Sequence, residues 1–553
     1  MSDRKRILFC NEASFLCSGY GKYGREVLTR LHNTDKYDIA EFATYGTVQD
    51  PRSSSIPWDY YANAVTDKDP RFSEYQRNPS NQFGEWRFER VALDFKPNIV
   101  WDIRDFWMLN YQANSPLKDY FHWSIMPTVD SAPQRPEWLE IFSRADSVFT
   151  YSDWSYDVLE KEGAGTLNLI SSASPGVDTE IFSPVKNKTA HKGAMGLEED
   201  VKIIGTVMRN QKRKLYPDLF AAFREYLDEC ERQGKKELAQ KTFLYCHTSY
   251  PDVGWDFPTL LKEFGLGNKV LFTYVCKQTG NCFPSFFRGA QAVSPFTKAY
   301  TAVFPSVSSG ITDEQLAEIY NIFDVHVQYA ICEGFGMPQV EAASCGVPVM
   351  AVDYSAMTDV VRKINGYPIK VKRLFRELET GAYRAMPDNS DLVSSLLHFF
   401  SSPQPVRQRK GMKAREGVFE HYTWDQTAKV WEDHFDSIEF KKNQNKWNSP
   451  ARPAPANFNI QDIPNNSHYV EMLINQTLGV DRENTFRKSE YVKDLNHKAR
   501  FDGRGWKHFD REKLVNILKV HCQNINNCEA ARCGQMQMEF PDYIQFAHAR
   551  RSQ

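Results

Sequence analysis

The sequence contains no long apolar segment. No run of about 18 apolar residues occurs in the 553-residue chain, so we expect no membrane span. The basic residues at 4–6 precede only a short apolar stretch, which is unlike a secretory signal peptide. The 11 cysteines are scattered, often within apolar runs, and this pattern favours reduced thiols. The sequence therefore predicts a cytoplasmic protein.

The chain also lacks a strong net charge, because 70 Asp and Glu residues offset 68 Lys and Arg residues. The distribution is uneven, however. Residues 441–553 contain 18 basic and 12 acidic side chains, and residues 500–509 interleave cations with aromatic rings. Such a segment is able to bind a polyanion and stack bases, but a small domain that packs on the protein is an equal alternative. The same region has residue types able to bind zinc, although their spacing is irregular: His521, Cys522, Cys528 and Cys533.

The most informative part of the sequence is residues 331–349, which read Ile-Cys-Glu-Gly-Phe-Gly-Met-Pro-Gln-Val-Glu-Ala-Ala-Ser-Cys-Gly-Val-Pro-Val. An apolar run at 323–330 predicts a buried strand before it. Gly334 and Gly336 allow the backbone to approach a ligand closely, and Gly346 stands where a helix commonly ends. The pattern predicts a strand, a glycine loop and a short helix whose free N–H groups face an anion.

Two carboxylates, Glu333 and Glu341, bracket this loop. Carboxylates do not help to bind an anion, but each accepts hydrogen bonds from two neighbouring hydroxyl groups. An anion with diols on both sides has the chemistry of a nucleoside diphosphate sugar. A structural strand–loop–helix with two surface glutamates is the alternative interpretation.

This segment resembles the Glu-x7-Glu signature of the retaining GT-B glycosyltransferases of glycosyltransferase family 4. The resemblance implies an α/β protein with two Rossmann-like, doubly wound domains facing across a cleft, plus a C-terminal extension. It implies that Glu341 holds the donor ribose and that Glu333, as a catalytic residue, fixes hydroxyls of the transferred sugar. It also implies that no metal or other cofactor is required. Four loop residues are implied to contact the donor diphosphate: Gly334, Phe335, Gly336 and Met337.

A second glycine cluster, Ser-Gly-Tyr-Gly-Lys-Tyr-Gly at 18–24, follows a strand predicted at 6–11 and leads into a helix predicted at about 23–31. It matches the G-x-G-x-x-G dinucleotide fingerprint, so a nicotinamide oxidoreductase is a competing hypothesis. The fingerprint, however, begins directly at the strand end. The resemblance instead assigns Gly19 and Gly21 to a loop that closes over the donor, and a turn-and-cap cluster is the structural alternative.

A basic cluster follows the apolar run 201–207, which predicts the first strand of a second domain. The spacing of the family places Arg209 and Lys214 on the donor diphosphate, where fixed cations stabilise the charge of the leaving group. Lys212 and Arg213 are expected on a solvated face. A surface charge run is the alternative interpretation of the whole cluster.

Asp130 is a second catalytic candidate. Related enzymes often carry a Thr-x-His pattern here, after the strand predicted at 122–128, whereas this chain has Thr128-Val129-Asp130. An aspartate is able to orient or deprotonate an acceptor hydroxyl, but it is also a common cap of a following segment. Asp102, at the end of another predicted strand, is expected to be structural.

The predicted domains follow from these elements. An acceptor domain at 1–185 is closed by a helix at 405–440, and a donor domain covers 190–404. Residues 441–467 are rich in Pro and Asn and predict a linker, and 468–553 predict a basic accessory region.

Two further segments depart from a regular α/β pattern. The Pro-containing residues 45–82 predict a long loop or an insertion, and the Phe-rich residues 276–306 predict an insertion loop near the acceptor.

The sequence thus predicts a retaining glycosyltransferase, a hexosyl- or pentosyltransferase, with a nucleoside diphosphate sugar as co-substrate and UDP as the expected nucleotide. The acceptor stays open. A hydroxymethylated DNA base, as in phage DNA modification, is one hypothesis, and a polysaccharide, small metabolite or protein is another. A catalytically inactive GT-B protein that binds nucleic acid is the alternative from another class.

Overall fold

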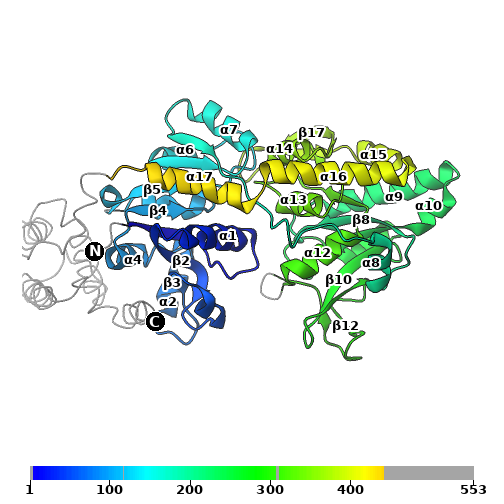
Figure 1. Ribbon diagram of the computed structural model, residues 1–553, viewed down its shortest axis with the longest axis horizontal. Coiled ribbons are helices and arrows are strands. Elements are labelled where there is room, and N and C mark those ends of the chain that lie inside the picture. Colours follow the sequence, from blue (N-terminus) through cyan, green and yellow to red (C-terminus); the bar gives the residue numbers. More distant parts are fainter. Residues whose placement is uncertain (1–3, 116, 307–309, 441–553) are drawn as a thin grey trace, which may run out of the picture. The chain divides into compact units, whose positions relative to one another are not determined.

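The computed structural model describes residues 4–115, 117–306 and 310–440 (Figure 1). The predicted linker and the basic accessory region lie outside these residues, as does the zinc hypothesis. Contacts divide the described chain into two compact units. The first unit comprises residues 4–15, 31–125 and 435–440, and the second comprises residues 16–30 and 126–434.

The first unit is built on parallel strands in the order β3-β2-β1-β4-β5. In the central strand β1, Ile7 lies opposite Ile39 of β2 and Ile99 of β4. All three are buried, so apolar side chains form the interior of this unit. The strands are β1 (Lys5–Glu12), β2 (Tyr37–Thr47), β3 (Asp59–Ala64), β4 (Ile99–Asp102) and β5 (His122–Ile125). The short helical elements are η1 (Pro51–Ser55), α2 (Phe72–Arg77), α3 (Pro79–Gln82), α4 (Phe88–Phe95), η2 (Phe106–Met108), α5 (Asn110–Ala113) and η3 (Lys118–Tyr120).

The prediction of a long loop or insertion at 45–82 is wrong in part. The segment contains β3, which is almost entirely buried, and the helices α2 and α3. Two of its prolines, Pro51 and Pro79, occupy the first turn of helical elements, where the missing N–H costs nothing. They therefore mark the starts of elements and not a continuous loop.

The second unit is built on a larger sheet in the order β12-β13-β10-β9-β8-β14-β15-β16, with β11 paired to β10. The strands from β10 to β16 along this order run parallel, as in a doubly wound domain. The parallel strands are β8 (Lys202–Val207), β9 (Thr242–His247), β10 (Val270–Cys276), β14 (Val325–Gln328), β15 (Val349–Val352) and β16 (Tyr367–Ile369). Strands β6 (Ser147–Thr150) and β7 (Leu169–Ser172) also pair in parallel.

Residues 276–306, predicted to be an insertion loop, instead extend this sheet. They form three antiparallel strands beyond β10, because hairpins fold the chain back onto its edge. These strands are β11 (Cys282–Phe286), β12 (Gln291–Ala292) and β13 (Ala302–Val303).

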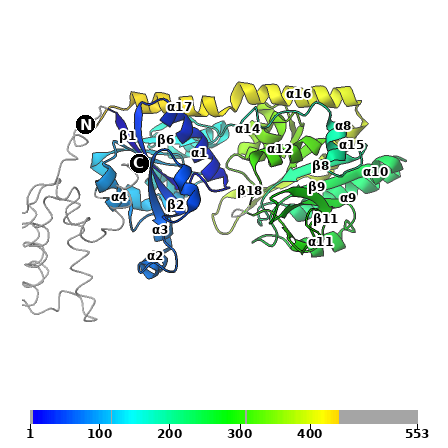
Figure 2. The ribbon, with the colours of Figure 1, turned by 60° about the horizontal axis from the view of Figure 1, so that its bottom comes forward.

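Helices accompany the strands of the second unit, and none of the described helices has the length and apolar character needed to cross a bilayer. Helix α16 packs along α13 and α14 (Figures 1 and 2). Gly411 allows this approach, because a Cβ there would lie 2.0 Å from the carbonyl oxygen of Gly346. The helices are α1 (Gly19–Asn33), α6 (Pro136–Ser143), α7 (Asp153–Gly163), α8 (Lys188–Ala194), α9 (Tyr216–Arg232), α10 (Lys236–Lys241), α11 (Phe257–Glu263), α12 (Asp313–Ile322), α13 (Met337–Ser344), α14 (Ala356–Lys363), α15 (Asn389–Ser401), α16 (Gln404–His421) and α17 (Trp424–Ser437).

A two-stranded hairpin, β17 (Val371–Arg376) and β18 (Tyr383–Pro387), stands apart from the large sheet. Its tip is bound to the segment after β5. The backbone N–H of Tyr383 donates to the carbonyl oxygen of Ala132 at 2.8 Å, and Arg135 Nε donates to the carbonyl oxygen of Thr380 at 2.9 Å. These contacts bring residues 130–135 beside the hairpin.

Candidate functional site

The glycine loop has the local structure that its sequence predicts. Strand β14 ends at Gln328, and helix α13 begins at Met337. Gly336 caps the helix with φ of 90°, a conformation that side chains with a Cβ rarely adopt. Gly346 follows the helix with φ of 69°. The predicted strand, loop, helix and second strand are confirmed.

Gly334 provides a close approach between segments. A Cβ at this position would lie 2.7 Å from Cγ2 of Thr128. The hydroxyl group of Thr128 is in turn hydrogen-bonded to that of Tyr20 at 2.5 Å. The absence of a side chain at Gly334 therefore lets the glycine loop, the start of α1 and the segment after β5 meet at one place.

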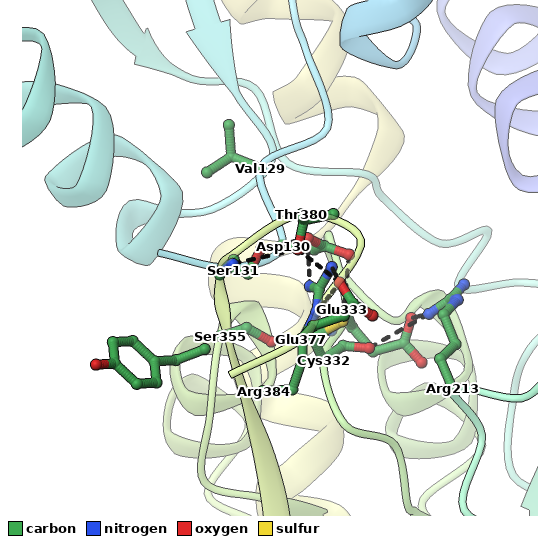
Figure 3. A network of polar contacts seen from close by, with 12 residues as sticks. Val129, Asp130, Ser131, Arg213, Cys332, Glu333, Ser355, Glu377, Thr380 and Arg384 are labelled. Atoms are coloured by element: carbon green, nitrogen blue, oxygen red, sulfur yellow. Dashed lines mark hydrogen bonds and ion pairs between the residues drawn. The ribbon is translucent and has the colours of Figure 1, made fainter. Parts of the chain in front are cut away.

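Glu333 lies at the centre of a buried polar cluster (Figure 3), with only 5% of its surface exposed. One carboxylate oxygen accepts a hydrogen bond from Gln328 Nε2 at 2.6 Å and pairs with the ammonium group of Lys214. The other accepts from Arg213 Nη1 at 2.8 Å. The sequence predicts that Lys214 binds the donor diphosphate. In the structure, its ammonium group pairs with the Glu333 carboxylate. Arg213, expected on a solvated face, has 40% of its side chain exposed and at the same time pairs with Glu333.

The two cations control the ionisation of Glu333. Burial opposes the charged form, but Lys214 and Arg213 outweigh burial and lower the pKa of Glu333 to about 2. Burial and the neighbouring Arg213 lower the pKa of the Lys214 ammonium to about 8, although Glu333 acts in the opposite direction. The cluster thus contains one carboxylate, always ionised near neutral pH, and two cations.

Glu341 lies within α13 and has a different set of partners. One carboxylate oxygen accepts from Lys22 Nζ at 2.9 Å, and the other accepts from the Tyr320 hydroxyl at 2.8 Å. Lys22 Nζ also pairs with Asp313 Oδ1 at 3.1 Å. Only 4% of the Glu341 surface is exposed, so this glutamate is not the surface residue of the alternative interpretation.

Asp130 is held by side chains from distant parts of the sequence (Figure 3). Its Oδ1 accepts from Arg384 Nη1 at 2.8 Å and from the Ser131 hydroxyl at 2.9 Å. Its Oδ2 lies 3.2 Å from the thiol sulfur of Cys332, the residue before Glu333. Arg384 also binds Glu377 through Nε and Nη2, at 3.0 and 2.8 Å. None of these partners is a backbone N–H group, so the described contacts do not make Asp130 a helix cap.

Arg209 takes part in a different ion pair. Its Nε and Nη2 donate to Asp252 at 2.8 and 3.0 Å, and 47% of its side chain is exposed. Burial raises the pKa of Asp252, but hydrogen bonds from Arg209 and Ser249 outweigh it and lower this pKa to about 2. The structure thus places Arg213, not Arg209, beside Lys214.

Gly19 and Gly21 lie within the first turn of α1, which begins four residues earlier than predicted. The Ser18 hydroxyl accepts from the backbone N–H of Gly21 at 3.0 Å, as an N-cap residue does. A Cβ on Gly19 would lie 3.7 Å from Sδ of Met337, at the start of α13. Glycines inside a helix do not form the turn of a dinucleotide fingerprint, which weakens the oxidoreductase hypothesis.

Sequence patterns do not reveal three members of the site. Arg384 and Glu377 belong to the hairpin, and Lys22 lies in the glycine cluster without being distinguished by it. Only the contact of Lys22 with Glu341, 319 residues away in sequence, identifies it. Among the described residues, no group of three or more His, Cys, Asp or Glu side chains has an arrangement suited to a metal ion.

Comparison with known proteins gives partial matches in sequence. Residues 306–379, which contain the glycine loop, match the family described as Glycosyl transferases group 1. The chain is 25% identical to a D-inositol 3-phosphate glycosyltransferase of Mycobacteroides abscessus over 267 residues, 47% of this chain and 44% of that protein. It is 30% identical to an MMP alpha-(1->4)-mannosyltransferase of Mycolicibacterium hassiacum over 121 residues, 22% of this chain and 26% of that protein. The matches therefore span less than half of either relative.

Solved structures match more of the chain. Sucrose-phosphate synthase from Thermosynechococcus elongatus aligns with a TM-score of 0.57 at 18% identity and covers 79% of this chain and 100% of that one. Anabaena HepE, in complex with UDP and glucose, aligns with a TM-score of 0.52 at 12% identity over 79% of this chain and 100% of that one. Identities this low establish the fold alone. The protein therefore has the predicted GT-B fold, and its segment 306–379 is similar to group 1 glycosyl transferases.

Proposed function

We propose that this protein is a retaining glycosyltransferase that moves a sugar from a nucleoside diphosphate sugar, with UDP as the nucleotide, to an acceptor hydroxyl. The observation that carries the proposal is the arrangement around α13. Two buried carboxylates, Glu333 and Glu341, lie on either side of a glycine-capped helix start, and they pair with two cations and one cation, respectively.

The donor diphosphate binds at the start of α13 in this proposal. The free N–H groups of Phe335, Gly336 and Met337 favour an anion, as does the positive end of the helix dipole. Lys214 and Arg213, which both pair with Glu333, supply positive charge at this place. That charge stabilises the leaving diphosphate as the glycosidic bond breaks.

The carboxylates bind the hydroxyl groups at both ends of the donor. Glu341 accepts hydrogen bonds from the ribose diol, and Glu333 accepts them from hydroxyls of the transferred sugar. Asp130, 28% exposed at its side chain, orients the acceptor hydroxyl. The resemblance implies a front-face reaction in which the leaving phosphate oxygen helps to deprotonate the acceptor, so configuration at the anomeric carbon is retained. No metal or cofactor takes part in this proposal.

The hypothesis of a hydroxymethylated DNA base as acceptor rests on the charge and composition of residues 441–553, which the structure does not describe, and on the aspartate at position 130. Incubation of the full chain with a donor and hydroxymethylated duplex DNA tests it. Transfer that is lost when these residues are deleted supports the hypothesis, and transfer to other acceptors only contradicts it.

A donor screen tests the proposal itself. Thermal unfolding is followed with UDP-, GDP- and ADP-sugars, and the stabilising donor is then incubated with the protein while its anomeric proton is followed by NMR. We expect stabilisation by one nucleotide series and slow release of sugar with retained configuration. Inverted sugar contradicts the retaining mechanism. If no donor stabilises the protein and no sugar is released from any of them, the proposed glycosyltransferase activity is contradicted. That result favours the alternative of an inactive GT-B protein.

A further inference from the structure

Each carboxylate oxygen of Glu341 accepts one hydrogen bond from a side chain. An ionised carboxylate accepts about four hydrogen bonds, two on each oxygen. Lys22 Nζ takes one position on Oε1, and the Tyr320 hydroxyl takes one on Oε2, at 2.9 and 2.8 Å. Among the described residues no further group donates to either oxygen, which leaves one acceptor position on each, the number that a pair of vicinal hydroxyl groups requires.

Lys22 is itself fixed on several sides. It is 9% exposed, its ammonium group pairs with Asp313 Oδ1 at 3.1 Å, and it lies 4.6 Å from the centre of the Phe182 ring. Burial lowers the pKa of Lys22, but Glu341 and Asp313 outweigh burial and raise it above its ordinary value. The ammonium group is therefore charged at neutral pH, and its contacts with Glu341 and Asp313 hold it in place.

Lys22 connects two segments that sequence analysis treats separately. It lies in the second turn of α1, which begins with the Gly19–Gly21 segment, and Glu341 lies in α13, which begins with the glycine loop. No other ion pair of Glu341 appears among the described residues. The orientation of this carboxylate thus depends on Lys22 and Tyr320 together.

We infer that Lys22 is a positioning residue of the nucleotide site, which holds the Glu341 carboxylate so that its two remaining acceptor positions meet a ribose diol. The inference rests on the proposed function, because it takes Glu341 as the ribose ligand. Its physical basis is pre-organisation: a carboxylate already fixed by two partners loses little conformational freedom when the diol binds. Lys22 does not touch the ligand in this arrangement and acts only through Glu341.

The test compares two ligands on the full chain by isothermal titration: UDP, and its 2′,3′-dideoxy analogue, which lacks the diol. We expect the wild type to prefer UDP, and Lys22→Met to reduce this preference about tenfold, because a carboxylate without its cation is poorly oriented. Loss of a positive charge near the diphosphate weakens both ligands equally and leaves the preference unchanged. The ratio of the two Kd values therefore isolates the role of Lys22 at the diol.

Two variants control for folding. Lys22→Arg keeps the cation and is expected to restore most of the preference. Asp313→Asn leaves the ion pair between Lys22 and Glu341 in place, and we expect it to change the preference by less than about twofold. Thermal unfolding of each variant identifies any that do not fold.

The possible results separate the inference from the proposed function. A Lys22→Met variant that folds and keeps the wild-type preference, or that binds UDP more tightly, overturns the inference. A wild-type chain that binds both ligands equally well contradicts Glu341 as the ribose ligand, and a chain that binds no nucleotide contradicts the proposed function.

Discussion

Asp102 of the first unit and Glu333 of the second are both buried carboxylates paired with cations, but their surroundings differ in charge. Asp102, at the end of β4, has one cation, Arg104, and accepts further hydrogen bonds from Gln112 and Trp123 at 2.9 and 2.7 Å. Asp102 and Arg104 are almost completely buried. Glu333 has two cations, and one of them, Arg213, is 40% exposed at its side chain.

The difference distinguishes a structural pair from the proposed donor site. Burial raises the pKa of Asp102 in spite of Arg104, whereas the two cations lower that of Glu333 to about 2. The Asp102 pair is neutral and leaves no charge for a ligand. Glu333 is paired with two cations, and one of them, Arg213, reaches solvent, where it is able to meet an anion. We therefore expect changes at the first pair to affect stability and changes at the second to affect donor chemistry.

The largest effect is expected from Arg104→Met. The variant leaves the Asp102 carboxylate buried without its cation, and we expect a loss of about 3–5 kcal/mol in unfolding free energy, measured by urea denaturation. Arg52→Met is the matched control, because Arg52 forms an exposed pair with Asp50 and its loss costs less than about 1 kcal/mol. Equal losses for the two variants contradict a structural role specific to the buried pair.

At the second cluster, Glu333→Gln is expected to lower turnover of the nucleotide sugar roughly 100-fold, because the neutral amide no longer balances Lys214 and Arg213 or accepts sugar hydroxyls strongly. Turnover is measured as release of free sugar, with UDP affinity determined in parallel. UDP lacks the sugar, and the substitution removes a negative charge beside the two cations, so UDP affinity should not fall. A variant with wild-type turnover contradicts Glu333 as a catalytic residue.

A smaller effect is expected from Asp130→Asn. The amide oxygen of the variant still accepts a hydrogen bond from Arg384, so the hairpin contact survives while the charge at the acceptor side is lost. We expect turnover to fall about tenfold with UDP affinity unchanged. Weakened UDP binding would show that Asp130 belongs to the donor side, and unchanged turnover would leave it a structural residue.

The smallest effect concerns pH. The pKa of Lys214 is lowered to about 8, so its ammonium group, charged below this pH, is progressively neutralised above it. UDP affinity should therefore decline several-fold between about pH 7 and pH 9, as one cation at the diphosphate is lost. Titrations of Lys214→Arg give the comparison, because its guanidinium stays charged and should remove the decline. A wild-type affinity that is constant over this range contradicts Lys214 as a diphosphate ligand.

The sequence predicts the local part of the site well. The turn from β14 to α13 follows from glycines and a proline at fixed positions, and the positions of Glu333 and Glu341 follow from that turn. Lys214 is correctly placed near the loop because it follows the neighbouring strand β8. These features depend on residues that are close together in the sequence, so sequence patterns are able to predict them.

The rest of the site depends on contacts between distant segments. Arg384 reaches Asp130 across 254 residues, and Lys22 reaches Glu341 across 319, and no local pattern marks either pair. The strands within 276–306 escaped prediction for a similar reason, since they exist only through pairing with the edge strand β10. The ion pair between Arg213 and Glu333 is not predicted either, because a run of basic residues does not show which of them contacts a carboxylate.

The central claim is that Glu341 and Glu333 bind the two ends of one nucleotide sugar. Titration of UDP into Glu341→Gln tests it most directly, because the amide keeps the size of the side chain but accepts the ribose diol poorly. We predict a Kd roughly 30-fold above that of the wild type, in a variant that thermal unfolding shows to be folded. An unchanged Kd in a folded variant would contradict the account.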